Sequence, residues 1–273
     1  MKPVVWVGLA LFAVIPDATA QPAVPPLWEV GVFAGAASTP AYPASTERTY
    51  RGLVLPYLIY RGDIVRVDRG GIGARLLHTD TVELDVGFAA SLPASSSDIA
   101  ARKDMPDLGT LIEFGPRLKG TLAKTASGGR VRFELPLRSV LEINNGVRSQ
   151  GYALEPEVVY EMRDVGGNWR LSTSLSAVMG DRALNQYFYG VPAAFATAQR
   201  PVYEARAGLI ATRLTFNAAK SIGPDLRVYG FARYESYAHS ANQNSPLYLQ
   251  TTGTSIGMGV SWTLGRSTTS ARD

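Results

Sequence analysis

Few residues of this chain have the types and spacing that could support catalysis. The sequence has two His and no Cys, which excludes thiolate chemistry and makes a His-rich metal site an unfavourable interpretation. His239 lies close to Ser236 and Ser240, a combination that serine nucleophiles use, while His78 stands apart from them. Nothing in the sequence supplies the oriented base and third group that such catalysis needs. We therefore expect no catalytic residue, no metal site and no cofactor.

Paired carboxylates are a second possible source of chemistry. Glu155 and Glu157 are two residues apart, which on a strand places both side chains on one face, about 7 Å from each other. Glycosidases use two carboxylates in this way. Since Arg residues are expected opposite this pair, we interpret it as structural.

The positions of the charged residues predict strands. In the segments 82–92, 108–122, 130–142 and 152–163, every charged residue falls in one register of a two-residue period, and the other register is apolar. Residues 255–264 alternate between large apolar side chains and Gly, Ser or Thr. Each strand therefore has two very different faces.

The lengths of the strands and of their connections favour a transmembrane barrel over a soluble sheet. Thirteen residues at a tilt near 45° rise about 30 Å, which matches the hydrocarbon core of a bilayer. Long and short links mostly alternate, as in barrels with long outer loops and tight periplasmic turns. We predict an all-β fold, an antiparallel barrel of about twelve strands, with ten possible because the pair at 63–79 is short. The expected strands are 28–36, 51–60, 63–69, 72–79, 82–92, 108–123, 130–142, 151–163, 169–181, 203–217, 226–238 and 253–264.

The N-terminus has the pattern of a secretory signal peptide. Lys2 precedes a twelve-residue apolar stretch, Val4 to Ile15, and Ala18-Thr19-Ala20 ends in a small residue. We expect cleavage between Ala20 and Gln21, with residues 21–273 forming one barrel domain and 265–273 a polar tail. A membrane anchor is the alternative, but twelve residues are short for a span. The mild net charge of +4 and the absence of dense Lys/Arg clusters indicate no nucleic-acid partner.

The charged register must face the lumen, because an Arg or Lys facing lipid at the midplane costs about 2–4 kcal/mol. These side chains form either a charge-selective channel or, in our preferred interpretation, ion pairs that brace the wall. The expected lumen residues are Arg66, Asp68, Glu83, Asp85, Glu113, Arg117, Lys119, Arg132, Glu134, Arg138, Glu155, Glu157 and Glu161.

Two groups of aromatic residues have separate expectations. Those near strand ends are expected to form interfacial girdles; they are Trp28, Tyr57, Tyr60, Trp169, Tyr203, Tyr234, Tyr237 and Trp262. Tyr187, Phe188 and Tyr189 lie in the longest loop, where they could contact a partner or pack inward over the barrel mouth.

The chain resembles the MipA/OmpV family of outer-membrane proteins over nearly its whole mature length. The resemblance is carried by Ala41-Tyr42-Pro43-Ala44-Ser45, Leu55-Pro56-Tyr57, Tyr60-Arg61-Gly62-Asp63, Val67-Asp68-Arg69-Gly70-Gly71, Met105-Pro106-Asp107-Leu108, Glu113-Phe114-Gly115-Pro116, Leu135-Pro136-Leu137-Arg138, Asp181-Arg182 and Tyr187-Phe188-Tyr189-Gly190-Val191. It implies a barrel in the outer membrane of a Gram-negative bacterium. For the namesake it implies a scaffold that holds a lytic transglycosylase near a murein synthase, while other members resemble porins or adhesins.

One feature departs from the family pattern. Family members tend to end on an aromatic residue that closes the last strand and is read by the barrel-assembly machinery. Here Trp262-Thr263-Leu264 is followed by Gly265 to Asp273. We expect a non-catalytic scaffold embedded in outer-membrane lipid, with a narrow porin-like channel or an uptake or adhesion protein as the alternative.

Overall fold

The computed structural model describes residues 26–61, 65–68, 71–78, 82–91, 93–144 and 146–270. Side chains are described for these residues apart from 61, 65–68, 71–78, 87–90 and 164. The expected signal peptide and its cleavage site at Ala20 and Gln21 lie outside the described residues.

Within these ranges, thirteen strands form one antiparallel sheet. They are β1 (Trp28–Pro40), β2 (Arg48–Arg61), β3 (Val65–Asp68), β4 (Gly71–His78), β5 (Val82–Ser91), β6 (Thr110–Lys124), β7 (Arg130–Ile143), β8 (Val147–Leu154), β9 (Glu157–Val165), β10 (Trp169–Gly180), β11 (Gly208–Ile222), β12 (Leu226–Ser236) and β13 (Thr252–Arg266).

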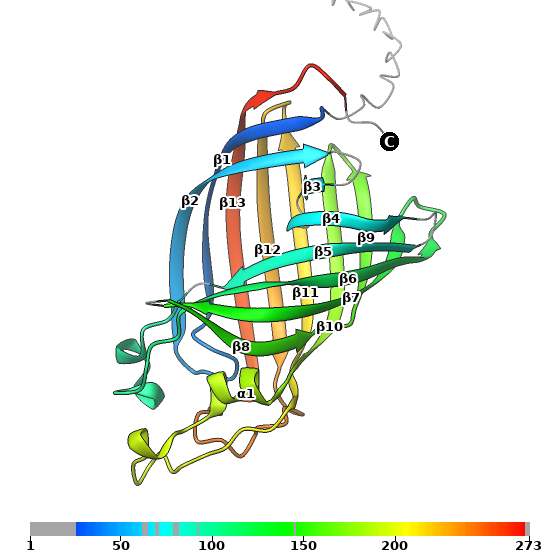
Figure 1. The fold of residues 1–273 in the computed structure, drawn as a ribbon. Coiled ribbons are helices and arrows are strands. Elements are labelled where there is room, and N and C mark those ends of the chain that lie inside the picture. Colours follow the sequence, from blue (N-terminus) through cyan, green and yellow to red (C-terminus); the bar gives the residue numbers. More distant parts are fainter. Residues whose placement is uncertain are drawn as a thin grey trace, which may run out of the picture.

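The sheet closes on itself to form a barrel. β13 pairs with β1, and β10 pairs with both β9 and β11, so the strands form a ring (Figure 1). β7 pairs with β8 through residues 137–143 and with β9 through residues 130–134. β8 and β9 are therefore two halves of one interrupted strand, and the prediction of a twelve-stranded antiparallel barrel is confirmed.

The connections divide between the two ends of the barrel (Figure 1). Long loops lie at one end, here called the loop end; they join β1 to β2, β5 to β6, β10 to β11 and β12 to β13. They contain the helix α1 (Arg182–Tyr189) and the short 3-10 helices η1 (Ser96–Asp98), η2 (Ala100–Arg102) and η3 (Ala193–Phe195). Among the described residues, no helix has the length and apolarity required to cross a bilayer. The other end, the turn end, holds the short turns between β6 and β7, β9 and β10, and β11 and β12, together with both ends of the described chain, whereas the short link from β7 to β8 lies at the loop end.

One predicted strand is displaced along the chain. The prediction placed a strand at 203–217, whereas β11 runs from Gly208 to Ile222. Residues 203–207 are instead held in the loops, because the backbone N–H of Ala205 donates to Gln186 and that of Arg206 donates to Asn242. The prediction was wrong at this boundary because these bonds come from residues distant in sequence.

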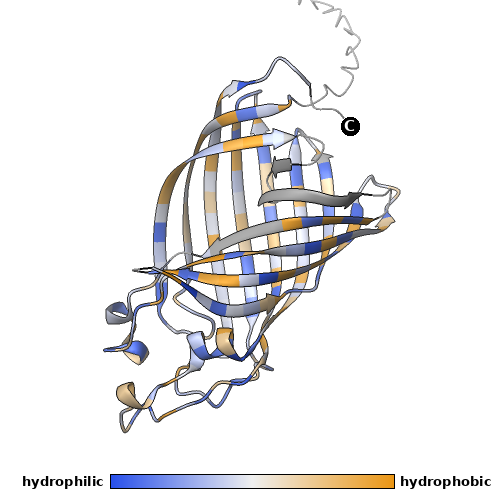
Figure 2. Ribbon diagram, viewed as in Figure 1, coloured by the Kyte–Doolittle hydropathy of each residue, from blue (hydrophilic) through white to orange (hydrophobic). Residues whose placement is uncertain are grey.

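The two strand faces have the chemistry that the alternation predicts (Figure 2). On β13, Ile256, Met258 and Trp262 are 59%, 75% and 61% exposed, while Ser255 and Ser261 between them are buried. Large apolar side chains exposed all around a closed barrel cannot be covered by the chain itself. The bilayer must cover them, which identifies a transmembrane barrel.

Three prolines interrupt the ladder at adjacent positions. Pro116 on β6 lies within the break in pairing between Phe114 and Arg117, and Pro136 on β7 is the residue opposite Arg117. Pro156 separates β8 from β9, and the backbone N–H of the preceding Glu155 donates to the Pro136 carbonyl at 3.2 Å. Proline has no N–H to give to a ladder, so it is found in sheets where pairing is already broken. The aligned prolines explain why the strand formed by β8 and β9 is divided.

At the same break, we predict that Gly115 cannot be replaced by a residue with a side chain without loss of stability. A Cβ added there would lie 2.0 Å from the Leu137 carbonyl oxygen, which is backbone and cannot rotate away. We expect Gly115→Ala to lower the free energy of unfolding by about 1–3 kcal/mol, measured by urea titration in lipid vesicles. The control is Gly230→Ala, where the nearest atom would be 3.8 Å away. Equal stabilities of the two variants would contradict the described register of β6 and β7.

Candidate functional site

Charged side chains on the inner face form two connected sets of ion pairs. The first, here called the wall network, crosses β5, β6, β7 and β9. Its contacts are Lys119–Glu83 (3.5 Å), Lys119–Asp85 (2.6 Å), Arg117–Asp85 (2.7 Å), Arg117–Glu134 (3.8 Å), Arg132–Glu134 (3.1 Å), Arg132–Glu161 (3.4 Å) and Arg163–Glu161 (2.7 Å).

The second set, here called the waist network, extends along the wall from β6 to β12. Arg138 contacts Glu113 at 3.2 Å and Glu155 at 3.0 Å. Arg213 on β11 contacts the same Glu155 at 3.2 Å and Glu235 on β12 at 2.7 Å. Glu155 occupies the gap between β8 and β9, so the break in that strand places its carboxylate between two arginines.

The structure locates the predicted lumen residues as follows. All those with described side chains except Glu157 take part in one of the two networks. Glu157 pairs in register with Glu134 on β7 and Ser176 on β10. Arg66 and Asp68 lie on β3, but their side chains are outside the described set.

Sequence reasoning missed the charged residues of β10 to β12 that face the same lumen. The inward positions of β12 are Arg227, Tyr229, Phe231, Arg233 and Glu235, which follow the same two-residue period. Aromatic side chains share this register with the charges, so an apolar-against-charged pattern does not reveal it. The period alone would have found them.

The loop end is closed by a packed core, here called the loop plug. It consists of the four long loops with α1, and its buried side chains form two adjoining apolar clusters. Tyr42, Ile99, Tyr189, Tyr237 and Leu247 are each at most 3% exposed. Side chains buried to this degree pack as in the interior of a globular protein.

A buried arginine holds three loops of the plug together. Arg102 is 3% exposed; its guanidinium donates to the carbonyls of Pro106 (3.2 Å) and Phe188 (3.4 Å) and lies 5.8 Å from the ring centroid of Tyr42. Burial lowers the pKa of Arg102, but an arginine remains charged at any physiological pH. It therefore acts as a permanent cationic cross-link between the loops.

The aromatic triplet of the longest loop packs inward. Tyr189 is completely buried, and Tyr187 and Phe188 pack against the two apolar clusters. The Tyr187 hydroxyl donates to Glu142 on β7 at 3.1 Å. Of the two interpretations considered for this triplet, the structure places it over the barrel mouth.

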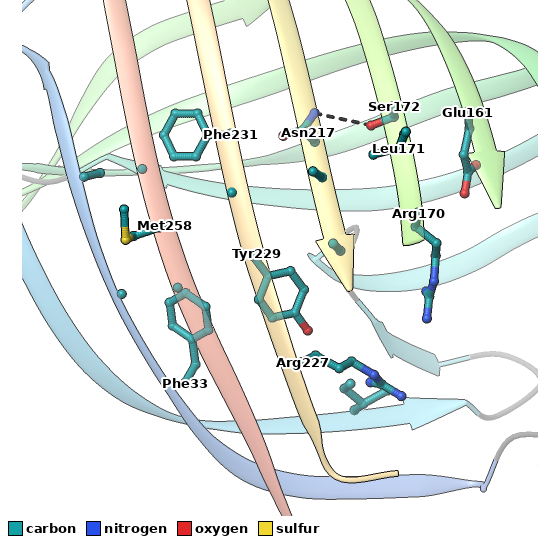
Figure 3. A pocket seen from close by; sticks show the side chains of 18 of the residues that line it. Phe33, Glu161, Arg170, Leu171, Ser172, Asn217, Arg227, Tyr229, Phe231 and Met258 are labelled. Carbon is teal, nitrogen blue, oxygen red and sulfur yellow. Dashed lines mark hydrogen bonds between the residues drawn. The ribbon is translucent and has the colours of Figure 1, made fainter. Parts of the chain in front are cut away.

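A cavity of about 1190 Å³ lies inside the barrel, on the turn-end side of the waist network. Its described lining residues come from strands and from Pro26, and the loops contribute none of them. It extends to Pro26 and Arg266 at the turn end, and Figure 3 shows Arg170 and Arg227 projecting into it. The barrel thus has a closed loop end and a vestibule at the turn end.

Comparisons with known proteins place this architecture in a family. Residues 32–264 match the family described as MltA-interacting protein MipA. The chain belongs to the MipA family. A comparison with curated proteins finds no match.

Several solved structures have low similarity to this MipA-family chain. A bacterial polysaccharide outer membrane secretin has a TM-score of 0.41 and 9% identity, over 87% of this chain and 99% of that one. OmpT, an outer membrane protein of Vibrio cholerae, has a TM-score of 0.35 and 8% identity, over 86% and 99%. A Pseudomonas aeruginosa FadL homologue has a TM-score of 0.26 and 8% identity, over 87% and 90%.

Several of the motifs that carry the family resemblance map to the loop plug. Residues 41–45, 105–108 and 187–191 all contribute buried side chains to the two apolar clusters. Motifs 113–116 and 135–138 contain two of the three aligned prolines. These motifs therefore lie where the loop end is packed and where the ladder between β6, β7 and β8 is interrupted.

Of the His and Ser residues considered for catalysis, the structure describes the side chains of Ser236, His239 and Ser240. His239 is an exposed residue of the plug, and Ser240 is buried, with its hydroxyl accepting from the Asn242 backbone at 3.3 Å. His78 ends β4, and its side chain is outside the described set. No group of three metal-ligating side chains occurs among the residues with described positions.

Three of the expected girdle residues have other positions in this MipA-family barrel. Tyr57 points into the lumen, where its hydroxyl lies 2.7 Å from that of Thr263. Tyr203 and Tyr237 pack in the loop plug. The prediction was wrong for Tyr57 because this position of β2 faces the lumen, and for Tyr203 and Tyr237 because the residues at the loop end pack into the plug.

The residues after Leu264 are partly ordered by pairing. Gly265 and Arg266 belong to β13, which pairs with β1 through Glu29 and Val30. The Ser267 N–H then donates to the Trp28 carbonyl at 3.0 Å. The first part of the expected tail thus extends the seam at which the barrel closes.

The buried tyrosines predict loosening of the plug at alkaline pH. Burial raises the pKa of Tyr42, Tyr189 and Tyr237 above the ordinary value of about 10. Because the neutral phenol is favoured in the folded state, this contribution to stability is complete below pH ~10 and falls as pH rises through the folded-state values. We expect the near-ultraviolet circular dichroism of the plug to be constant from pH 7 to about 10 and to decrease above it. Loss of the signal below pH 9 would contradict the burial.

Proposed function

We propose that this chain is a non-catalytic, non-conducting barrel of the outer membrane whose turn end holds cell-wall enzymes. The observation that carries the proposal is the asymmetry of the barrel, closed by the loop plug at one end and hollow at the other. In outer-membrane barrels the short turns face the periplasm. With this orientation the vestibule opens toward the compartment that contains peptidoglycan.

The closed loop end favours a scaffold over a porin. A conducting pore needs a continuous aqueous path, whereas here the plug buries Tyr189, Tyr237 and Leu247 across the mouth. The waist network lies beneath the plug and pairs its charges with one another. Both features stabilise the barrel and oppose the passage of solutes.

The family description supports the choice of partner. It names MltA as what the family namesake interacts with, and the family resemblance implies that this partner is a lytic transglycosylase. We propose that this chain likewise binds a lytic transglycosylase, and with it a murein synthase, through its periplasmic turns. The barrel-assembly machinery would insert the chain into the lipid of the outer membrane.

Planar-bilayer recordings test the closed mouth. We expect the wild-type barrel to give no steady conductance steps. A variant with residues 183–206 replaced by a short Gly-Ser linker should conduct, which would demonstrate that the protein inserts and that the plug blocks it. Steady steps from the wild-type protein would favour the porin alternative.

Binding to a purified lytic transglycosylase tests the scaffold role. One variant replaces the turns 125–129, 166–168 and 223–225 with Gly-Ser segments of equal length. Its control replaces Arg182 and Glu204, which are exposed at the loop end, with Ala. We expect surface-plasmon binding to be lost in the turn variant and retained in the control. Loss in the control alone would place the partner on the outer face and overturn the proposal.

A further inference from the structure

One wall of the vestibule carries aromatic rings packed over glycines. A Cβ on Gly257 would lie 2.4 Å from the Phe231 ring, and a Cβ on Gly259 would lie 2.5 Å from the Phe33 ring. The rings can therefore lie against β13 only because these positions have no side chain. Tyr229 lies beside them, with its ring centroid 6.1 Å from that of Phe33, and all three residues line the cavity (Figure 3).

The remaining lining is predominantly cationic. Among the described lining residues there are eight Arg or Lys and three carboxylates. Arg163 on β9 and Arg170 on β10 are direct cross-strand neighbours, so two cations lie side by side on this wall, and Glu161 is a carboxylate that contacts Arg163. The Arg163 side chain is 56% exposed, and among the described residues it contacts Glu161 through Nε. The exposed part of this guanidinium keeps further N–H donors for an added anion.

Uncharged polar groups complete the lining. The Asn217 amide donates to the Ser172 hydroxyl at 3.4 Å (Figure 3). The Tyr229 hydroxyl lies 3.0 Å from that of Ser261. These side chains combine donors and acceptors, which suits a ligand rich in hydroxyl groups.

We propose that the vestibule binds an acidic saccharide, with its sugar rings on Phe33, Tyr229 and Phe231 and its carboxylates on the arginines. The C–H face of a sugar ring is weakly positive and is attracted to the negative face of an aromatic ring. Arginine is the side chain best matched to a carboxylate, because its N–H groups form a planar fork. The cavity exceeds the roughly 300–1,000 Å³ of pockets for drug-sized molecules, which leaves room for more than one sugar ring.

The charged entrance favours a saccharide over an acyl chain. A ligand that enters from the turn end passes Glu29, Arg227 and Arg266, and Arg227 contacts Glu29 at 3.6 Å. A hydrated, anionic ligand loses little on passing such groups, whereas an apolar chain gains nothing from them. This inference concerns a ligand site and does not depend on the proposed scaffold role.

Titration calorimetry on the full barrel in detergent tests the site with three probes. The first is the acidic disaccharide of N-acetylglucosamine and N-acetylmuramic acid. The second is di-N-acetylchitobiose, which has similar rings without a carboxylate, and the third is laurate, which has a carboxylate without a sugar ring. We expect the acidic disaccharide to bind about tenfold or more tightly than the neutral one, because one charged hydrogen-bonded pair has this effect. Equal affinities of the two sugars, or tighter binding of laurate, would overturn the proposal.

Matched substitutions locate the site within the barrel. Phe231→Ala should weaken binding of both disaccharides about tenfold, in the range found for loss of a stacking aromatic ring. Arg163→Gln should remove most of the preference for the acidic sugar and leave the affinity for the neutral sugar unchanged. Phe216→Ala, on the outer face of β11 and 46% exposed, should change neither.

Two controls keep the experiment decisive. Heat-modifiable mobility in gels establishes that each variant has folded, and Phe231→Leu, which keeps bulk but removes the ring, replaces Phe231→Ala if that variant does not fold. Unchanged affinity in a folded Phe231 variant, or an equal loss in Phe216→Ala, contradicts the assignment of the aromatic wall.

Discussion

Replacing Arg213 with Ala lowers the free energy of unfolding by about 3–5 kcal/mol, the largest effect that we expect from a single ion-pair residue. Among the described residues, Arg213 is the one cation that contacts both Glu155 and Glu235, and the side chains of these two glutamates are 14% and 8% exposed. Without it, two carboxylates remain in the lumen with one cation fewer between them. Urea titration of the barrel in lipid vesicles, followed by tryptophan fluorescence, measures the change.

The control for this experiment is Arg182→Ala. Arg182 contacts Glu204 at the loop end, where the two side chains are 68% and 77% exposed. Exposed pairs are worth about 0–1 kcal/mol, so this variant should be almost as stable as the wild type. A similar small loss in Arg213→Ala would mean that water solvates the waist and that the network is not a structural brace.

Placing an arginine at Leu214 tests the lipid-facing surface. Leu214 lies near the middle of β11, and its side chain points outward and is 49% exposed. A cation facing the hydrocarbon midplane costs about 2–4 kcal/mol, so Leu214→Arg should unfold at a clearly lower urea concentration.

The matched substitution is Asn217→Arg on the same strand. Asn217 lines the vestibule, where an arginine remains in contact with water, and the change should be within about 1 kcal/mol. If Asn217→Arg destabilised the barrel more than Leu214→Arg, the assignment of the lipid-facing and lumen-facing sides of β11 would be wrong.

The strands, and the face of the sheet on which each side chain lies, could be predicted from the sequence because both depend on local pattern. The two-residue period of 82–92 and 130–142 assigns each side chain to a face, and strand lengths near those of a bilayer decide which face is outside. The pairing of the first strand with the last could also be predicted, since an even number of strands leaves both ends of the chain at the turn end. Errors occur at positions such as 203–207, where hydrogen bonds from distant loops override the local pattern.

The partners of the lumen charges could not be predicted in the same way. Glu155 and Arg213 are far apart in sequence, and their contact depends on the barrel closing and on the gap at Pro156. The aromatic wall was hidden for a related reason. Gly257 and Gly259 appear as small residues of one strand, and only their position beneath the rings of β1 and β12 gives them a role.

The seam between β1 and β13 constrains the order in which the molecule can be made. Its two strands are the first and last of the described barrel, so the ring has a gap until β13 has paired with β1. Before that moment β1 presents a free edge, which would readily pair with another unfinished chain. Biogenesis must therefore keep the leading strand sheltered during the whole of translocation, and a chain shortened at its C-terminus would leave it permanently exposed to aggregation.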